Sequence, residues 1–362
     1  MIEDNISWLE NLPSNVASFL ENQRSENLDG YYSYSESGDL YPDSIKWNVG
    51  SSCYALKILY TLGVEDKDKI EPLINYILTF KKDNSMIYDD MIVKRSFVRN
   101  FLSSVKNKRF ENLLHQNYKR AETRQCLSAL DLYNAIPNEI NIVCPTSEQQ
   151  IDSFLSSLNW NLPWAAGSHL SHLLFFLSKK HKLEQISKEN YSDLVAFTLK
   201  WIKKYELSNT GGWGTTLTDE RGIINGSMKV ITGLQNVGVT DYSNSKKLID
   251  TCLQYYEKGH ACDNFNIVYV LNKLNNSLNS SYRHEEICNF MMEKLSVYQD
   301  HYKPSSGGFS FNRDSSNINY YGLNITKGKN EADIHGTVLF LWGACLIADT
   351  LEMNLGLREF IA

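Results

Sequence analysis

The stretch that decides the fold is residues 200–237, KWIKKYELSNTGGWGTTLTDERGIINGSMKVITGLQNV. It reads as a helix end, a Gly-Gly-Trp-Gly turn, a polar loop and a second, apolar helix. The same order recurs at residues 291–311, MMEKLSVYQDHYKPSSGGFSF, followed by residues 331–351, EADIHGTVLFLWGACLIADTL. A weaker copy occupies residues 16–34 and 47–63. A helix–turn–helix unit that repeats along a chain indicates an architecture built from stacked copies of that unit.

The composition is that of a globular chain able to bury a large core. Of the 362 residues, 42% are hydrophobic and 22% are charged,. The net charge of −6 and the lack of a basic block argue against nucleic acid or an anionic membrane as the main partner,. No apolar run approaches the roughly 18 residues of a membrane span. The acidic N-terminus, MIEDNISWLE, lacks the features of a signal peptide,.

The cysteines indicate a reducing compartment. The chain has seven, an odd number, and they are scattered rather than arranged as a disulfide framework,. We therefore expect a cytoplasmic protein. The sequence leaves its oligomeric state open.

Helical periodicity predicts six pairs of helices. A helical insertion at about residues 83–119 is expected to interrupt the second pair, within a single domain spanning residues 1–362. The predicted pairs are 6–22 with 48–62, 66–81 with 120–135, 147–158 with 167–179, 190–205 with 222–237, 244–258 with 262–274, and 284–298 with 334–351.

The two members of each pair differ in character. The first carries Lys, Glu and Asn on one face, whereas the second is apolar nearly all round, as in TVLFLWGACLI from Thr337. Amphipathic helices belong on the outside of a fold, and helices that are hydrophobic on every side belong inside. Six outer and six inner helices that alternate along the chain predict an all-α fold, an (α/α)6 toroid.

Two glycine pairs support this ring. Gly211-Gly212 and Gly307-Gly308 both follow a predicted outer helix and supply backbone freedom at positive φ,. The aromatic residue after each pair, Trp213 or Phe309, is placed to fill the seam between the two layers.

The outer-helix, Gly-Gly-aromatic, inner-helix pattern at Gly211–Gly214 and Gly307–Ser310 resembles the aromatic repeat of the terpenoid cyclase and protein prenyltransferase superfamily. The resemblance implies an α/α toroid with an isoprenoid substrate in a central cavity. Other toroids with similar repeats include vitamin-binding proteins, thioester domains, glycosidases and polysaccharide lyases. Fold alone therefore leaves the function open.

In a closed double ring, the starts of the inner helices line one end of the central cavity. These helix ends carry partial positive charge and free N–H groups, which attract anionic ligands and acidic side chains. Because ionisable residues occur at five of the six predicted starts, we expect an aromatic, acid-lined cavity. The residues concerned are Asn48, Ser51 and Ser52; Arg120, Glu122, Thr123 and Arg124; Ser168, His169 and His172; Asp219, Glu220, Arg221 and Asn225; His260, Cys262, Asp263, Asn264 and Asn266; and Glu331, Asp333 and His335.

Cyclase-like chemistry would use Asp263 or Asp333 as the acid. The pair Cys262-Asp263 resembles the arrangement of epoxide-opening cyclases, although the full Asp-rich motif of the acid-initiating relatives is missing. An aspartate buried against aromatic rings would have a raised pKa, which a general acid needs. Aromatic faces could stabilise a cation. The candidates are Phe265, Tyr269 and Trp342. For each aspartate, capping of the helix that follows explains its position as well as catalysis does.

A zinc site is the alternative use of the same residues. No cofactor is expected, but Cys262, Asp263 and His335 are ligand types that zinc accepts, and zinc-dependent prenyltransferases use such a set,. Adjacent residues on a helix point about 100° apart, which opposes joint ligation by Cys262 and Asp263.

Sugar chemistry is the second hypothesis, because toroidal glycosidases, lyases and epimerases use a carboxylate pair or a His/Tyr/Arg set in an aromatic cleft. Two polar clusters would face each other across the cavity, with aromatic side chains as stacking platforms. The clusters are Asp219, Glu220 and Arg221 against Glu331, Asp333 and His335, and the platforms are Trp164, Trp213 and Tyr321.

Four further residues are candidates for substrate binding. His169 and His172 share one face of a helix, and Arg120 and Arg124, one turn apart, could clamp a phosphate or a carboxylate,. The long loop 312–330 is a candidate lid,. A toroid that binds a ligand without catalysis is the third hypothesis.

Overall fold

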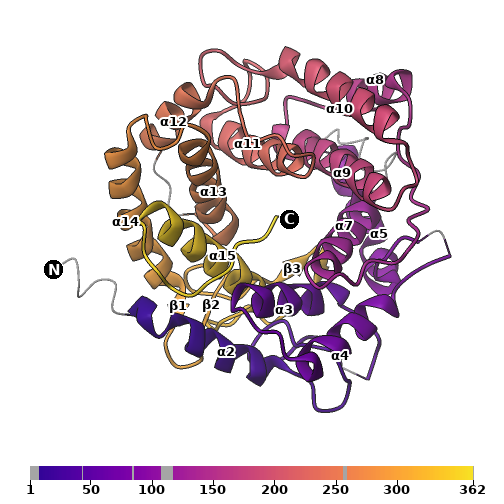
Figure 1. Cartoon of the computed structure of the whole chain (residues 1–362). Coiled ribbons are helices and arrows are strands. Elements are labelled where there is room, and N and C mark those ends of the chain that lie inside the picture. Colours follow the sequence, from indigo (N-terminus) through magenta and orange to yellow (C-terminus); the bar gives the residue numbers. More distant parts are fainter. Residues whose placement is uncertain (1–7, 43, 84, 107–116, 256–258, 362) are drawn as a thin grey trace.

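The computed structural model describes residues 8–42, 44–83, 85–106, 117–255 and 259–361, and in them the chain forms two nested rings of helices (Figure 1). Each inner helix packs on the next, and α15 packs on α3 to close the ring. The inner helices are α3 (Val49–Thr61), α7 (Asn117–Asp131), α9 (Pro163–Lys182), α11 (Glu220–Gln235), α13 (Ala261–Ser277) and α15 (Ile334–Thr350).

The outer ring alternates with the inner one along the chain. The predicted (α/α)6 toroid is thereby confirmed for the described residues. The predicted first and fifth outer helices extend into residues 1–7 and 256–258, which lie outside the described part. The outer helices are α2 (Leu12–Gln23), α4 (Lys67–Leu78), α8 (Glu148–Ser156), α10 (Lys188–Ile202), α12 (Ser245–Gln254) and α14 (His284–His301), with a short 3-10 turn η1 (Lys203–Tyr205) after α10.

Burial explains why the two kinds of helix separate. In α13 and α15 nearly every side chain is buried, including polar ones such as Asn272 and Thr337. The outer helix α12 buries one face and exposes its lysines. Apolar area removed from water stabilises a fold by about 25 cal/mol per Å². Helices that are apolar on most faces therefore gain most free energy in the inner ring, where nearly all of their surface is covered.

The glycine turns lie where the sequence predicts them. Gly307 has φ 83° in the turn between β1 (Tyr302–Lys303) and β2 (Gly308–Phe309). Phe309 is fully buried, with its ring centroid 5.2 Å from that of Phe340 on the inner helix α15 and 5.2 Å from that of Tyr302, which directly follows the outer helix α14. This aromatic residue therefore fills the seam between the layers. Gly211, at φ 77°, occupies the matching place after α10.

Two segments outside the repeat meet near the starts of the inner helices. Helix α5 (Asp90–Lys106) lies within the predicted insertion at 83–119, of which residues 84 and 107–116 are outside the described part. Strands β3 (Asn319–Tyr320) and β4 (Leu323–Asn324) form a hairpin within loop 312–330. From α5, Asn100 Nδ2 donates to the carbonyl of Tyr321 at 2.9 Å, and Arg99 Nη1 donates to that of Gly322 at 3.2 Å.

The C-terminal segment runs back into the centre of the ring (Figure 1). The amide of Arg358 donates to the carbonyl of Thr61 at 2.8 Å, and Glu359 forms an ion pair with Lys273 of α13. Across the described residues, no helix combines the length and the apolar character needed to cross a bilayer.

Gly211→Ala should destabilise the fold more than Gly238→Ala does. Both glycines have positive φ, a conformation that costs an alanine about 1–2 kcal/mol,. A Cβ at Gly211 would also lie 2.4 Å from the backbone nitrogen of Leu248, whereas a Cβ at Gly238 would have nothing within 4 Å. Urea unfolding of the two variants therefore isolates the cost of the clash, and equal losses of unfolding free energy would contradict the close packing of this turn against α12.

Candidate functional site

A cavity of about 510 Å³ lies inside the inner ring. Inner helices supply most of its walls, the β3–β4 hairpin covers it at the side of the helix starts, and Phe360 of the C-terminal segment borders it. Eight of the described lining residues are Phe, Tyr or Trp. They are Tyr54, Trp164, Phe265, Phe311, Tyr320, Tyr321, Trp342 and Phe360.

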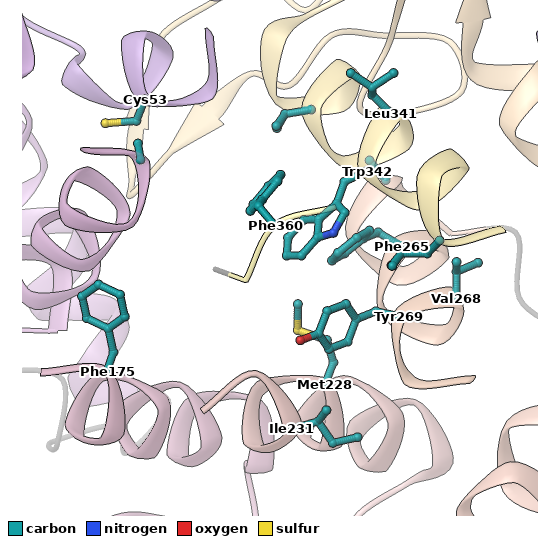
Figure 2. Packing of buried hydrophobic residues seen from close by; sticks show 14 of the residues in the cluster. Cys53, Phe175, Met228, Ile231, Phe265, Val268, Tyr269, Leu341, Trp342 and Phe360 are labelled. Carbon is teal, nitrogen blue, oxygen red and sulfur yellow. The ribbon is translucent and has the colours of Figure 1, made fainter. Parts of the chain in front are cut away.

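Phe360 separates this cavity from a second hollow. Its ring stacks on Trp342 with the centroids 4.2 Å apart, and the two rings lie side by side in Figure 2. The second hollow, about 440 Å³, is lined by residues at the ends of the inner helices together with Phe360 itself, among them Tyr60, Asp131, Lys179 and Asn236. The C-terminal segment therefore closes one end of the central cavity.

Three cations line the cavity. Lys57 of α3 is only 4% exposed, and its Nζ donates to Oε1 of Gln125 at 2.9 Å. Lys229 of α11 lies with Nζ 4.3 Å from the centroid of the Trp164 ring. Burial, and to a smaller extent the charge of Arg124 on α7, lowers the pKa of Lys57 to about 7 and that of Lys229 to about 8. Burial also lowers the pKa of Arg124, to about 10.

No aspartate or glutamate belongs to the lining among the described residues. The expectation of an acid-lined cavity is therefore wrong, and the cavity is instead lined by cations and aromatic rings. The carboxyl group of Glu122 lies directly behind the lining, where the Tyr320 hydroxyl contacts Oε2 at 2.9 Å and Oε1 at 3.2 Å. Burial raises the pKa of Glu122 to about 8, against the opposing hydrogen bond from Tyr320.

The β3–β4 hairpin delivers two tyrosines to the cavity. Its turn residues, Tyr321 and Gly322, both have positive φ, at 47° and 88°. A bulky residue in this conformation is strained, and such strain persists only where the surroundings hold it. Gly50 on α3 makes room for the hairpin, because a Cβ there would lie 2.2 Å from the hydroxyl of Tyr320.

His335 is a neutral side chain of the cavity wall. Its ring stacks on Tyr54 with centroids 4.7 Å apart, and burial lowers its pKa to about 3. Its Nδ1 lies 2.9 Å from the hydroxyl of Tyr34, which also accepts a hydrogen bond from Nδ2 of Asn317 at 2.9 Å. The Tyr34 hydroxyl can therefore donate its own hydrogen to Nδ1, which leaves the ring proton of His335 on Nε2.

His172 is a second neutral histidine in the lining. It is 2% exposed, its Nε2 lies 3.4 Å from Oγ of Ser168, and no described residue forms a hydrogen bond with its Nδ1. Burial and the charge of Arg124 hold its pKa well below the usual value. His169, one turn earlier, is fully buried and lies outside the lining.

Asp263 is an ion-pair partner and lies outside the lining. Arg221 donates to both of its oxygens, at 3.2 and 2.8 Å, and Asn225 donates to Oδ1 at 3.0 Å. Burial alone would raise the pKa of Asp263, but these hydrogen bonds outweigh it and hold the pKa below the usual value. The expectation of a raised pKa at this residue is wrong, because the neighbouring helix supplies a bidentate cation.

Asp333 caps α15 from a fully buried position. Its Oδ1 accepts from the amide of Gly336 at 2.8 Å, and its Oδ2 accepts from the amides of Phe311 and Asn317 at 2.7 and 3.0 Å. Burial raises its pKa to about 7, against the opposing effect of these hydrogen bonds. The carboxyl group thus joins the start of α15 to the chain on either side of Arg313, and it does not line the cavity.

The remaining candidates divide between the lining and other places. Arg124, His172, Tyr321, Trp342, His335 and Cys262 line the cavity. Asp219 caps α11 and is exposed, Glu220 is also exposed, and Trp213 is buried outside the lining. Arg120 donates to the carbonyl of Val143 at 2.8 Å. In the described part of the chain, no three metal-ligating side chains come together, so the set Cys262, Asp263 and His335 does not converge.

Sequence reasoning missed Lys57, Lys229, Tyr54 and Phe360 as lining residues. For the two lysines a signal was available, because each interrupts the apolar run of an inner helix, in ALKILY and in SMKVIT. A lysine placed inside a hydrophobic layer must reach a cavity or a partner. Phe360 carried no such signal, since it belongs to no repeat.

No family model and no curated protein matches this chain. Among solved structures, a protein from Actinoplanes is similar over 94% of this chain and 99% of its own, at 10% identity and a TM-score of 0.49. A glycosyl hydrolase family 88 protein from Bacteroides vulgatus is similar over 97% of this chain and 100% of its own, at 11% identity and a TM-score of 0.47. Neither is described as a terpenoid cyclase or a prenyltransferase, and both are too distant to bear on the reaction.

Glu122→Gln should remove a pH dependence from the stability. Below about pH 4.5 the Glu122 carboxyl is protonated in both states; from there to about pH 8 only the folded state keeps the proton, so stability falls as the pH rises. One such group contributes about 1.4 kcal/mol per pH unit in that window. Urea unfolding at several pH values should therefore show a flatter profile for Glu122→Gln. The exposed Glu293→Gln is the control, and parallel profiles for wild type and Glu122→Gln would contradict the raised pKa.

Proposed function

We propose that the protein is an enzyme acting on a small anionic sugar of the uronate class, by removing the proton next to the sugar carboxylate. Lyases and epimerases that act on uronates share this first step. The observation that carries the proposal is the lining of the cavity, where the basic side chains of Arg124, Lys229 and Lys57 stand among aromatic rings without a carboxylate in the described lining. Such a lining favours a ligand that carries both a negative charge and a stackable ring.

The cations supply the binding of the carboxylate. Arg124 can hold it through two parallel hydrogen bonds, and Lys229 adds a point charge from the neighbouring part of the wall. Neutralising a carboxylate makes the proton on the adjacent carbon easier to remove, because the charge that develops on the carboxylate is stabilised. The sugar ring would stack on Trp164 or Trp342, which border the same space.

His172 is our candidate for the base. It is uncharged, and its Nδ1 is a buried acceptor with no hydrogen-bond partner in the described part of the chain. A bound carboxylate beside it would raise its pKa toward neutrality and make it a better base. In an elimination the C5–H bond breaks, its electron pair forms the C4–C5 double bond, and the C4–O bond breaks toward the leaving oxygen.

Tyr54 is our candidate for the acid that protonates the leaving oxygen. Burial keeps the pKa of its hydroxyl well above the usual value, so the hydroxyl carries its proton at neutral pH. Within the described part of the chain no hydrogen-bond partner holds that hydroxyl. In an epimerisation the carbanion would instead be reprotonated at C5 from the opposite side.

The alternatives fit the lining less well. A glycosidase that works through two carboxyl groups needs both of them at the substrate. Asp263 and Asp333 are committed to an ion pair and a helix cap. A prenyl diphosphate would match the cations and the aromatic rings, so it serves as the competing ligand in the test.

Uronates should raise the melting temperature of the protein, and uncharged sugars should not. The test compares galacturonate, glucuronate and unsulfated uronate disaccharides with glucose and with a prenyl diphosphate, and follows the ultraviolet absorbance of an unsaturated product. Arg124→Gln should weaken uronate binding at least tenfold, because a charge-assisted bidentate contact contributes about 1.5–3 kcal/mol. Arg221→Gln, which removes a cation outside the lining, is the matched control. Stabilisation by the diphosphate alone would overturn the proposal.

Phe360→Ala should lengthen the saccharide that the enzyme accepts. The phenyl ring separates the central cavity from the second hollow, so its removal joins the two spaces. We expect the ratio of kcat/KM for trisaccharides over disaccharides to rise, and thermal stability to fall because a buried ring is lost. Phe290→Ala truncates a buried ring outside the cavity lining and controls for lost stability. An unchanged ratio would show that Phe360 does not set the length.

A further inference from the structure

Lys57 stands out among the buried groups because a lysine is costly to bury and this one has a neutral hydrogen-bond partner. It lies in the middle of α3, it is only 4% exposed, and its Nζ donates a hydrogen bond to the neutral amide of Gln125. In the described part of the chain no carboxylate forms an ion pair with it. Lysines are almost never buried unless paired.

The surroundings of Lys57 favour the uncharged amine. Burial is the larger cause, and Arg124 and Lys229 add like charge, so that the pKa falls to about 7. A desolvated lysine beside other cations is the form of the residue that acts as a nucleophile toward carbonyl carbon. One hydrogen of the amine is directed to Gln125, which leaves the nitrogen lone pair available.

The direction of access is also fixed. Nζ of Lys57 lies 5.5 Å from the centroid of the Phe360 ring, which closes the cavity on that side. A ligand must therefore reach the amine from the central cavity, where Arg124 and Lys229 lie. An anionic ligand held by these two cations would bring its other end toward the amine.

We propose that Lys57 forms an imine with the carbonyl group of an anionic sugar derivative, such as the aldehyde of an open-chain uronic acid. This inference rests on the proposed function only for the charge class of the ligand. The lone pair of Nζ attacks the carbonyl carbon, and the oxygen takes a proton to give a carbinolamine. Loss of water from the carbinolamine then forms the C=N bond. No oxidant or reductant takes part in these steps.

The test traps the imine by reduction. Wild-type protein is incubated with glyoxylate, a small anionic aldehyde, and separately with glucuronate, each with cyanoborohydride. Intact mass and peptide mapping then locate the secondary amine that reduction leaves. We expect one adduct per chain, on Lys57, at least tenfold faster than on any exposed lysine. Uncharged glyceraldehyde should label Lys57 more slowly than glyoxylate does.

Two variants identify the amine. Lys57→Arg keeps the positive charge and should lose the adduct, whereas Lys247→Arg, at an exposed position outside the cavity lining, should retain it on Lys57. Labelling of Lys229 in place of Lys57, or labelling spread evenly over exposed lysines, would overturn the inference. Because the peptide map of the wild type decides by itself, the test survives poor folding of either variant.

The outcome is separable from that of the proposed function. If the protein binds and converts uronates while Lys57 stays unlabelled, the imine inference alone fails. If glyoxylate labels Lys57 while no uronate is bound or converted, the proposed function fails and the reactive amine stands.

Discussion

The packing of α15 against α3 is the constraint on which the rest of the structure depends. It joins the end of the chain to its beginning and turns a row of helix pairs into a closed ring. The hydrogen bond between Tyr34 and His335, 301 positions apart, exists only because of this closure. In a closed inner ring, a polar side chain on the inner face of a helix can point only into the cavity, because the other faces of that helix are packed against neighbouring helices.

That confinement explains the chemistry of the lining. Arg124 lies over the Phe175 ring with its Cζ 5.7 Å from the ring centroid, Lys229 lies over Trp164, and Lys57 lies near Phe360. Cation–π contacts offset part of the cost of burying charge, about 0.5–2 kcal/mol each, but they do not neutralise it. Burying these basic groups costs stability, and an anionic ligand that bound among them would return part of that cost.

Much of the scaffold could be predicted from the sequence, because it depends on local pattern. Apolar periodicity located the helix pairs, and the glycine pairs at Gly211 and Gly307 located the turns. The site could not be predicted as well, since acidic residues at helix starts serve two purposes. Asp219 and Asp333 are helix caps, and Asp263 forms an ion pair with Arg221 of the neighbouring inner helix. Arg124 was among the predicted residues, whereas Lys57 and Lys229 lie further along their inner helices, where the only signal in the sequence is the break that each makes in an apolar run.

The ends of the cavity are built from the parts of the chain that do not repeat. Helix α5 holds the strained turn at Tyr321 from outside, through Asn100 and Arg99, while Gly50 and Glu122 receive Tyr320 from inside. At the opposite end, the C-terminal segment places Phe360 against Trp342. The repeated inner helices supply the walls and their basic side chains, whereas the hairpin and the C-terminal segment, which belong to no repeat, border the cavity at its two ends. The shape of this cavity therefore depends on segments that the repeat does not predict.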